Sequence, residues 1–94
     1  MSYELDIADV ALEDFHRLID SLPSSRRRDA TDAVEAALIR LAANPWLGHR
    51  EYLGRPSYHF SFKAGGVGHH WGCTFMFSED ETRLVVTHIF RVAL

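Results

Sequence analysis

The first half of the chain carries one short strand pattern and two helical patterns. Residues 3–7 alternate apolar and polar side chains, which is the period of a half-buried strand. Apolar residues then recur three or four positions apart, so they fall on one stripe of a helix. This stripe consists of Ala11, Phe15, Leu18, Ile19 and Leu22. A second stripe of the same kind consists of Ala30, Ala33, Val34, Ala37, Leu38 and Leu41.

The two predicted helices are expected to form an antiparallel hairpin. Only a short link containing Pro23 separates them, and short links place consecutive helices side by side. Asn44-Pro45 ends the second helix, because a residue before proline is pushed out of helical geometry.

The second half of the chain changes to a period of two. After a loop over residues 46–56, alternating apolar and polar residues predict three strands. Their apolar members are Tyr58, Phe60 and Phe62 in the first, Trp71, Cys73, Phe75 and Phe77 in the second, and Leu84, Val86, Phe90 and Val92 in the third. The glycine-rich segment Ala64–Gly68 predicts a flexible turn, and the acidic segment Ser78–Thr82 predicts another.

The order strand, helix, helix, strand, strand, strand predicts an α+β fold with two layers. The helices bury their apolar stripes only if they cover the apolar face of the sheet. We therefore expect the N-terminal strand and the helical hairpin to pack on one face of an antiparallel-rich sheet and to leave the other face open. The 94 residues suffice for one domain and not for two, so we expect a single domain over residues 1–94.

Composition narrows the class of protein. The hydrophobic fraction of 47% fits a globular protein, and no apolar run approaches the ~20 residues of a membrane helix. The acidic N-terminus lacks the basic-then-apolar pattern of a secretory signal. Cys73 is the only cysteine, which excludes an internal disulfide. We expect a cytoplasmic protein without a membrane partner.

Charge is unevenly distributed, although the net charge is only −3. Residues 1–45 carry nine acidic and five basic side chains, whereas residues 46–94 carry four acidic and five basic ones. Three of those four acids form Glu79-Asp80-Glu81 in the predicted acidic turn. The rest of the second half is therefore mildly basic, a weaker bias than a dedicated nucleic-acid binder usually shows.

Alternation also predicts which side chains the open face carries. Five apolar residues are expected to face the helices, namely Tyr58, Trp71, Phe75, Leu84 and Phe90. The opposite face then shows His59, Ser61, Lys63, His70, Thr74, Arg83, Thr87 and Arg91. Arginine and lysine neutralise phosphate and histidine transfers protons near neutral pH, so this face suits a phosphate backbone. A polar face is also what any half-covered antiparallel sheet shows to water, and that interpretation stays open.

Histidine and cysteine are considered as metal ligands and are not well arranged for that role. Alternation places His69 and Cys73 on one face and His70 on the other, so the tetrahedral set that zinc requires does not form. His88 falls on the core side by the same alternation, unless a β-bulge turns it over. We expect neither a metal nor a cofactor.

Four segments of the chain carry a resemblance to a known family. They are Tyr3–Leu22, the stretch Leu41-Ala42-Ala43-Asn44-Pro45-Trp46-Leu47-Gly48, Leu53-Gly54-Arg55, and the final strand Val85-Val86-Thr87-His88-Ile89-Phe90-Arg91. In these segments the chain resembles the RelE/ParE toxin superfamily. The resemblance extends from Tyr3 to Arg91. The glycine-rich turn departs from it, because we expect this turn to be longer than the tight turn usual in the family.

The resemblance implies a small toxin that arrests growth and is neutralised by an antitoxin. RelE-like members cut mRNA in the ribosomal decoding site, and ParE-like members poison DNA gyrase. In both cases the C-terminal segment of the antitoxin wraps the toxin. Three hypotheses stay open: a metal-independent mRNA-cleaving toxin, a gyrase inhibitor, and an inactive relative that acts only as a binding module.

The resemblance to RNA-cutting members also implies roles for individual residues. A ribose 2′-hydroxyl attacks the neighbouring phosphate, which requires a base and cations for the developing charge. Lys63 or His70 is then the base, with Arg83 and Arg91 as charge stabilisers. The implied substrate-binding residues are Arg55, His59 and Thr87.

Overall fold

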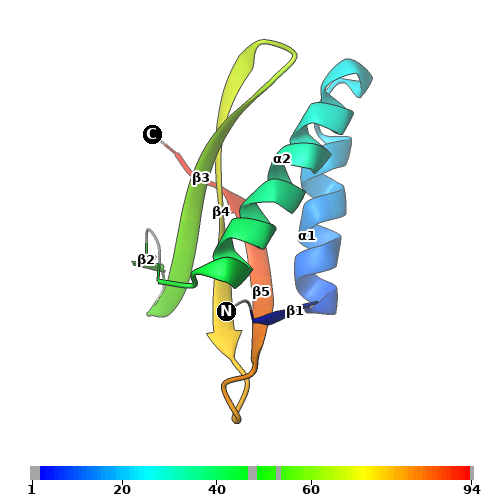
Figure 1. Cartoon of the computed structure of the whole chain (residues 1–94). Coiled ribbons are helices and arrows are strands. Elements are labelled where there is room, and N and C mark those ends of the chain that lie inside the picture. Colours follow the sequence, from blue (N-terminus) through cyan, green and yellow to red (C-terminus); the bar gives the residue numbers. More distant parts are fainter. Residues whose placement is uncertain (1–2, 47–48, 53, 94) are drawn as a thin grey trace.

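Two helices lie on one face of a five-stranded sheet in the computed structural model of the chain (Figure 1). The structure describes residues 3–46, 49–52 and 54–93. The elements in chain order are β1 (Glu4–Ile7), α1 (Asp9–Asp20), α2 (Ser24–Ala43), β2 (His49–Tyr52), β3 (Arg55–Ala64), β4 (Val67–Phe77) and β5 (Arg83–Arg91). This arrangement confirms the predicted α+β fold with two layers.

The sheet has the strand order β1-β5-β4-β3-β2. β1 pairs with β5 in parallel, and every other pair is antiparallel, as expected for an antiparallel-rich sheet. β1 therefore brings the start of the chain beside its last strand (Figure 1).

β2 lies inside the segment that the sequence pattern predicts to be a loop. The four residues His-Arg-Glu-Tyr lack apolar alternation, so a period of two gives no signal there. The strand exists because it pairs with β3 at the edge of the sheet.

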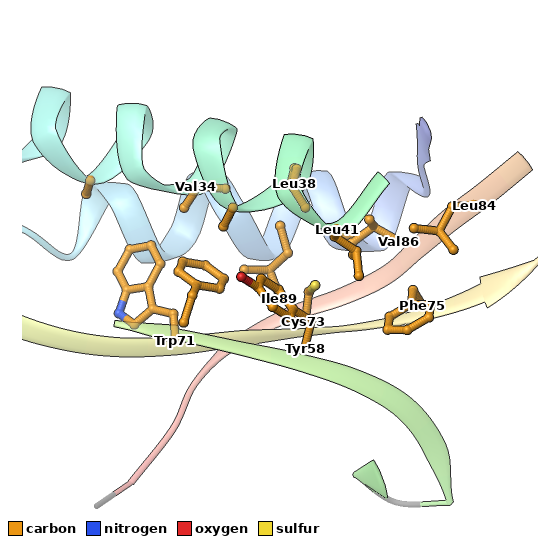
Figure 2. Close-up of a cluster of buried hydrophobic side chains, with 14 of the residues drawn as sticks. Val34, Leu38, Leu41, Tyr58, Trp71, Cys73, Phe75, Leu84, Val86 and Ile89 are labelled. Carbon is orange, nitrogen blue, oxygen red and sulfur yellow. The ribbon is translucent and has the colours of Figure 1, made fainter. Parts of the chain in front are cut away.

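The core fills the space between the helices and the sheet (Figure 2). Figure 2 shows Val34, Leu38 and Leu41 of α2 above the side chains of β4 and β5. The largest fully buried side chains are Trp71, Phe75, Leu41, Leu84, Val86, Cys73 and Ser57. Ala30 and Ala37 are also fully buried, which lets α2 approach the sheet closely. Within the described residues, neither helix combines the length and apolarity needed to cross a bilayer.

The turn between β3 and β4 is shorter than the sequence predicts. Ala64 pairs with Val67, so only Gly65 and Gly66 form the loop. Both have positive φ, +57° and +80°, as a two-residue type I′ hairpin turn requires. The carboxylate of Asp29 in α2 accepts the N–H of Gly65 at 3.0 Å and ties this hairpin to the helical layer.

Cys73 lies in this core, and its thiol is expected to resist alkylation in the folded chain. Burial raises the pKa of the Cys73 thiol from 9.0 to about 12. Because only the thiolate reacts, iodoacetamide at pH 8 should label the native chain roughly 10³-fold more slowly than the chain unfolded in urea. Mass spectrometry of timed samples measures both rates, and fast labelling of the native chain would contradict the buried placement.

Candidate functional site

A β-bulge in β5 decides which side chains reach the open face of the sheet. Thr74 pairs with His88 and Phe75 pairs with Val86, so Thr87 is an extra residue with no separate partner position on β4. One extra residue reverses the alternation beyond it. Beyond the bulge, Phe90 lies opposite Gly72 on the open face. The prediction that Phe90 faces the helices is therefore wrong.

The bulge also changes the face on which Arg91 lies. Alternation predicts that Arg91 lies on the open face. Arg91 pairs with Trp71, a core residue, so it leaves the sheet on the helix side. Its guanidinium donates a hydrogen bond to the Ser21 hydroxyl at the end of α1. Lys63, His70 and Arg91 consequently do not share one face, and the predicted cluster of these three residues is wrong.

Arg83 lies at the far end of the sheet from His70. It donates to Asp6 at 2.9 Å and is 3.2 Å from the Glu4 carboxylate. The Asp6 hydrogen bond, the nearby Asp6 charge and the Glu4 charge raise the pKa of Arg83. Phe77, beside Arg83, is seven positions along β4 from His70, a span of roughly 23 Å. Arg83 therefore links β1 to β5 and is not part of one site with His70.

Four polar residues occupy the open face of β3 and β4 as predicted. His59, Ser61 and Lys63 alternate along β3, and Ser61 pairs with His70 of β4. Thr87, although bulged, also reaches this face, because its hydroxyl is hydrogen-bonded to that of Thr74 at 2.7 Å. Arg55 begins β3 and pairs with Tyr52.

Four rings contact one another in succession across this face, and we call them the ring row. Tyr52 stacks on Phe90 with ring centroids 4.5 Å apart and an angle of 18° between the planes. The Phe90 ring meets His59 edge-on at 5.9 Å, and His59 meets His70 edge-on at 6.2 Å. The row covers part of the face that alternation predicts to be solvated, and Ser57 and Thr74 are buried.

Tyr52 and Phe90 are the members of the ring row that the sequence pattern misses. Tyr52 falls in the predicted loop. Phe90 lies beyond the bulge, so simple alternation along β5 assigns it to the wrong face of the sheet. The one available signal for Phe90 is the break in alternation at Val85 and Ile89, two apolar residues at positions expected to be polar.

Gly72 makes room for the ring row. A Cβ atom at Gly72 would lie 2.7 Å from Cδ2 of His59 and 3.0 Å from Cε2 of Phe90. Any larger residue at this position of β4 therefore has to displace both rings.

A Gly72→Ala substitution is expected to destabilise the chain by about 1–3 kcal/mol, the usual range for overpacking. It should also shift the NMR signals of the His59 and Phe90 rings. Gly68→Ala is the matched control, because nothing lies within 4 Å of its Cβ position. Equal urea midpoints and ring signals for the two variants would show that the rings are not seated over Gly72.

The two histidines of the ring row are each near a serine hydroxyl. Nδ1 of His70 is hydrogen-bonded to the Ser61 hydroxyl at 2.5 Å, and Nε2 of His59 lies 3.5 Å from the Ser57 hydroxyl. These contacts orient two imidazoles side by side on an accessible face. Imidazole both accepts and donates protons near neutral pH, so the pair is suited to general acid–base chemistry.

A hollow lies at each end of the ring row. The smaller, about 470 Å³, is lined by Ser61, Phe62, Lys63, Gly68, His69 and His70. The larger, about 750 Å³, lies where α1 runs beside β5 and is lined partly by Tyr52, Arg55 and Phe90. His88 also lines it, because the bulge turns this residue away from the core. Among the described residues, no group of three or more His, Cys, Asp or Glu side chains is placed to hold a metal ion.

Comparison with known proteins identifies the fold. No protein-family model matches the chain, and no curated protein matches it. Among solved structures, the intact E. coli RelBE toxin–antitoxin complex is 13% identical with a TM-score of 0.62, covering 99% of this chain and 100% of that one. The toxin–antitoxin complex RelBE2 from Mycobacterium tuberculosis is 20% identical with a TM-score of 0.60, covering 98% and 100%. E. coli toxin RelE in the free state, as a double arginine-to-alanine mutant, is 14% identical with a TM-score of 0.60, covering 97% and 84%. This chain therefore has the fold of the RelE toxins.

Proposed function

We propose that this chain is the toxin of a toxin–antitoxin pair and that it cleaves mRNA on the ribosome at the ring row, without a metal. The observation that supports this proposal most directly is the pair of imidazoles, His59 and His70. Their ring centroids lie 6.2 Å apart on an accessible sheet face. The RelE fold and the complexes among its solved neighbours support the toxin assignment.

In the proposed reaction His70 is the base and His59 is the acid. When Nδ1–H of His70 donates to the Ser61 oxygen, Nε2 carries the lone pair that accepts the proton of the ribose 2′-hydroxyl. The 2′-oxygen then bonds to the adjacent phosphorus, and the bond from phosphorus to the 5′-oxygen breaks. Protonated His59 gives its proton to that leaving oxygen. The products are a 2′,3′-cyclic phosphate and a 5′-hydroxyl.

A cation beside the pair stabilises the charge that develops on the phosphate. Lys63 lines the smaller hollow together with His70. Arg55 lies eight positions from Lys63 along β3 and lines the larger hollow, so it binds the RNA backbone away from the scissile phosphate. Positive groups aimed at developing charge are among the largest contributions to catalysis. In this proposal Lys63 takes the role that the family resemblance implied for Arg83 and Arg91, and Arg55 keeps the substrate-binding role that the resemblance implied for it.

Tyr52 and Phe90 make single-stranded RNA the preferred substrate. Unpaired bases stack on aromatic side chains, and the stacking tolerates any base because every base has a π-face. Tyr52 is 44% exposed, so its ring is accessible to a base.

An antitoxin is the proposed partner, and its binding segment covers the ring row. Solved neighbours include complexes of RelE-fold toxins with antitoxins, among them RelE with a peptide of the antitoxin RelB. A disordered segment that folds on binding covers a large surface and blocks access to RNA. Residues 1–94 then act as one domain, in the cytoplasm where ribosomes are found.

Expression of the chain in bacterial cells tests this function. We expect growth to stop, transcripts to be cut only when ribosomes translate them, and growth to resume when the neighbouring gene product is co-expressed. Primer extension maps the cuts. Blocked gyrase supercoiling with intact transcripts would contradict the proposal and favour a gyrase inhibitor. Soluble, folded protein without growth arrest would favour an inactive binding module.

A further inference from the structure

The bulge in β5 places different side chains in the core than an uninterrupted strand would. An uninterrupted ladder would point His88 and Phe90 into the core and Ile89 out of it. With the bulge, Ile89 lies opposite Cys73 and belongs to the core, as Figure 2 shows. Phe90 and Ile89 are both large and apolar, so exchanging one for the other in the core favours neither pairing strongly. The polar contacts around the bulge therefore determine which pairing forms.

Thr74 holds the bulge from β4. Its hydroxyl is hydrogen-bonded at 2.7 Å to the hydroxyl of Thr87, the extra residue of the bulge. Thr74 is 3% exposed, so breaking this bond would take a partner away from a buried hydroxyl. Such a loss is costly, because a buried polar group has no water to replace the partner. The bond thus ties the extra residue to the neighbouring strand.

Asp14 holds the bulge from α1. One of its carboxylate oxygens accepts the backbone N–H of Ile89 at 3.2 Å and lies 3.3 Å from Nδ1 of His88. These two residues directly follow Thr87 in the chain. The Asp14 side chain is only 15% exposed, and hydrogen bonds to a charged group are stronger than those between neutral groups. Asp14 therefore fixes the strand just beyond the bulge.

The bulge in turn determines where the Phe90 ring lies. Phe90 is opposite Gly72 on the open face of the sheet. There its ring stacks on Tyr52 and meets the His59 imidazole edge-on at 5.9 Å. In an uninterrupted strand Phe90 would face the helices, and His59 would lose this neighbour.

We propose that Thr74 and Asp14 are positioning residues, which hold the bulge and, through Phe90, fix the place of the His59 imidazole. This inference rests on the proposed function, in which His59 protonates the leaving 5′-oxygen. Bulges beside active sites commonly re-aim a side chain, and here the re-aimed side chain is the Phe90 ring. The family resemblance implies that Thr87 binds substrate, whereas in this proposal its hydroxyl holds the bulge to Thr74.

Two substitutions of Thr74 separate the effect of its hydroxyl from that of its shape. Thr74→Val keeps the shape without the hydroxyl, and Thr74→Ser keeps the hydroxyl. In NMR spectra of the intact chain, we expect the cross-peaks between the Phe90 and His59 rings to weaken in Thr74→Val and to persist in Thr74→Ser. Thr31→Val is the control, because the Thr31 hydroxyl donates to a carbonyl within α2. Cross-peaks that persist in Thr74→Val, or that weaken equally in Thr74→Ser, would overturn the role of the hydroxyl.

Asp14→Ala tests the contact with the backbone N–H of Ile89. The amide hydrogen of Ile89 should exchange with solvent about 10- to 100-fold faster, as expected when a hydrogen bond to a charged group is lost. Arg17→Ala is the matched control, because Arg17 donates to the other oxygen of Asp14 and is exposed. Equal exchange of the Ile89 amide in the two variants, with unchanged far-UV circular dichroism, would overturn the role of Asp14.

The rate of mRNA cutting on purified ribosomes connects the bulge to the proposed reaction. Thr74→Val should lower kcat about 10- to 100-fold with little change in KM, because a displaced His59 stabilises the transition state less, and Thr74→Ser should recover most of the rate. An unchanged rate in a variant whose ring cross-peaks are lost would overturn the positioning role. The spectra and the hydrogen exchange need no cleavage. An unaltered chain that cuts no RNA would therefore contradict the proposed function, while the ring cross-peaks would still decide whether Thr74 holds the bulge.

Discussion

A His70→Gln variant is expected to cut mRNA on the ribosome about 10²–10⁴-fold more slowly than the unaltered chain. Glutamine retains hydrogen-bonding groups near Ser61 but does not accept the proton of the 2′-hydroxyl. The rate constant for cutting a defined transcript on purified ribosomes measures the effect. His16→Gln is the matched control, because His16 is an exposed histidine of α1 that lines neither hollow.

The histidine pair also predicts how two substitutions combine. His59→Gln should slow cutting to a similar degree, and the double variant should be less impaired than the product of the two single effects, because the residues act as a unit. Full activity in His70→Gln would remove the base from the proposed mechanism.

A Trp71→Ala variant is expected to lose about 3–5 kcal/mol of folding free energy, the range measured when large buried aromatic residues are truncated. Trp71 is 1% exposed and lies in β4 beneath α2, as Figure 2 shows. Native domains are stable by only about 5–15 kcal/mol, so this loss approaches unfolding. Urea denaturation followed by circular dichroism measures it.

Two further variants test whether this loss of folding free energy comes from removing a buried aromatic ring. Ile39→Ala is the control for apolar truncation, because Ile39 is 70% exposed and should cost less than about 0.5 kcal/mol. Trp71→Phe should lower the folding free energy clearly less than Trp71→Ala, because an aromatic ring remains in the core. The indole N–H of Trp71 also has no hydrogen-bond partner within the described part of the chain, so no bond is lost with it. A Trp71→Ala cost equal to that of Ile39→Ala would contradict the observed core.

Asp14 illustrates a residue whose role no local pattern indicates. In sequence it is one of several acids in the first turns of a helix. In the structure its carboxylate accepts the N–H of Ile89, a group on the outer edge of β5 just beyond the point where β1 stops pairing. It completes the hydrogen bonding of the edge strand and orients His88, two roles that depend on contacts 75 and 74 positions away in the chain.

Local periodicity in this sequence determined the α+β class, the helical stripes and the faces of β3 and β4. Those features follow from the spacing of apolar residues, which is three or four in helices and two in strands. Each segment shows its own spacing, whatever the rest of the chain does. His59, Ser61, Lys63 and His70 were placed correctly on the open face because β3 and β4 pair without interruption along that stretch. Figure 1 shows the predicted helical layer over that pair.

Tertiary structure alone decided the composition of the candidate site. The bulge at Thr87 depends on how β5 registers against β4, and it moved Phe90 and His88 to the open face and Arg91 to the helix side. β2 formed through pairing rather than pattern, and it carried Tyr52 onto Phe90. Alternation assigns side chains to the two faces of a sheet only while the hydrogen-bonded ladder between strands is continuous. The pairing with the partner strand determines where a bulge interrupts the ladder, so the sequence of one strand does not reveal it.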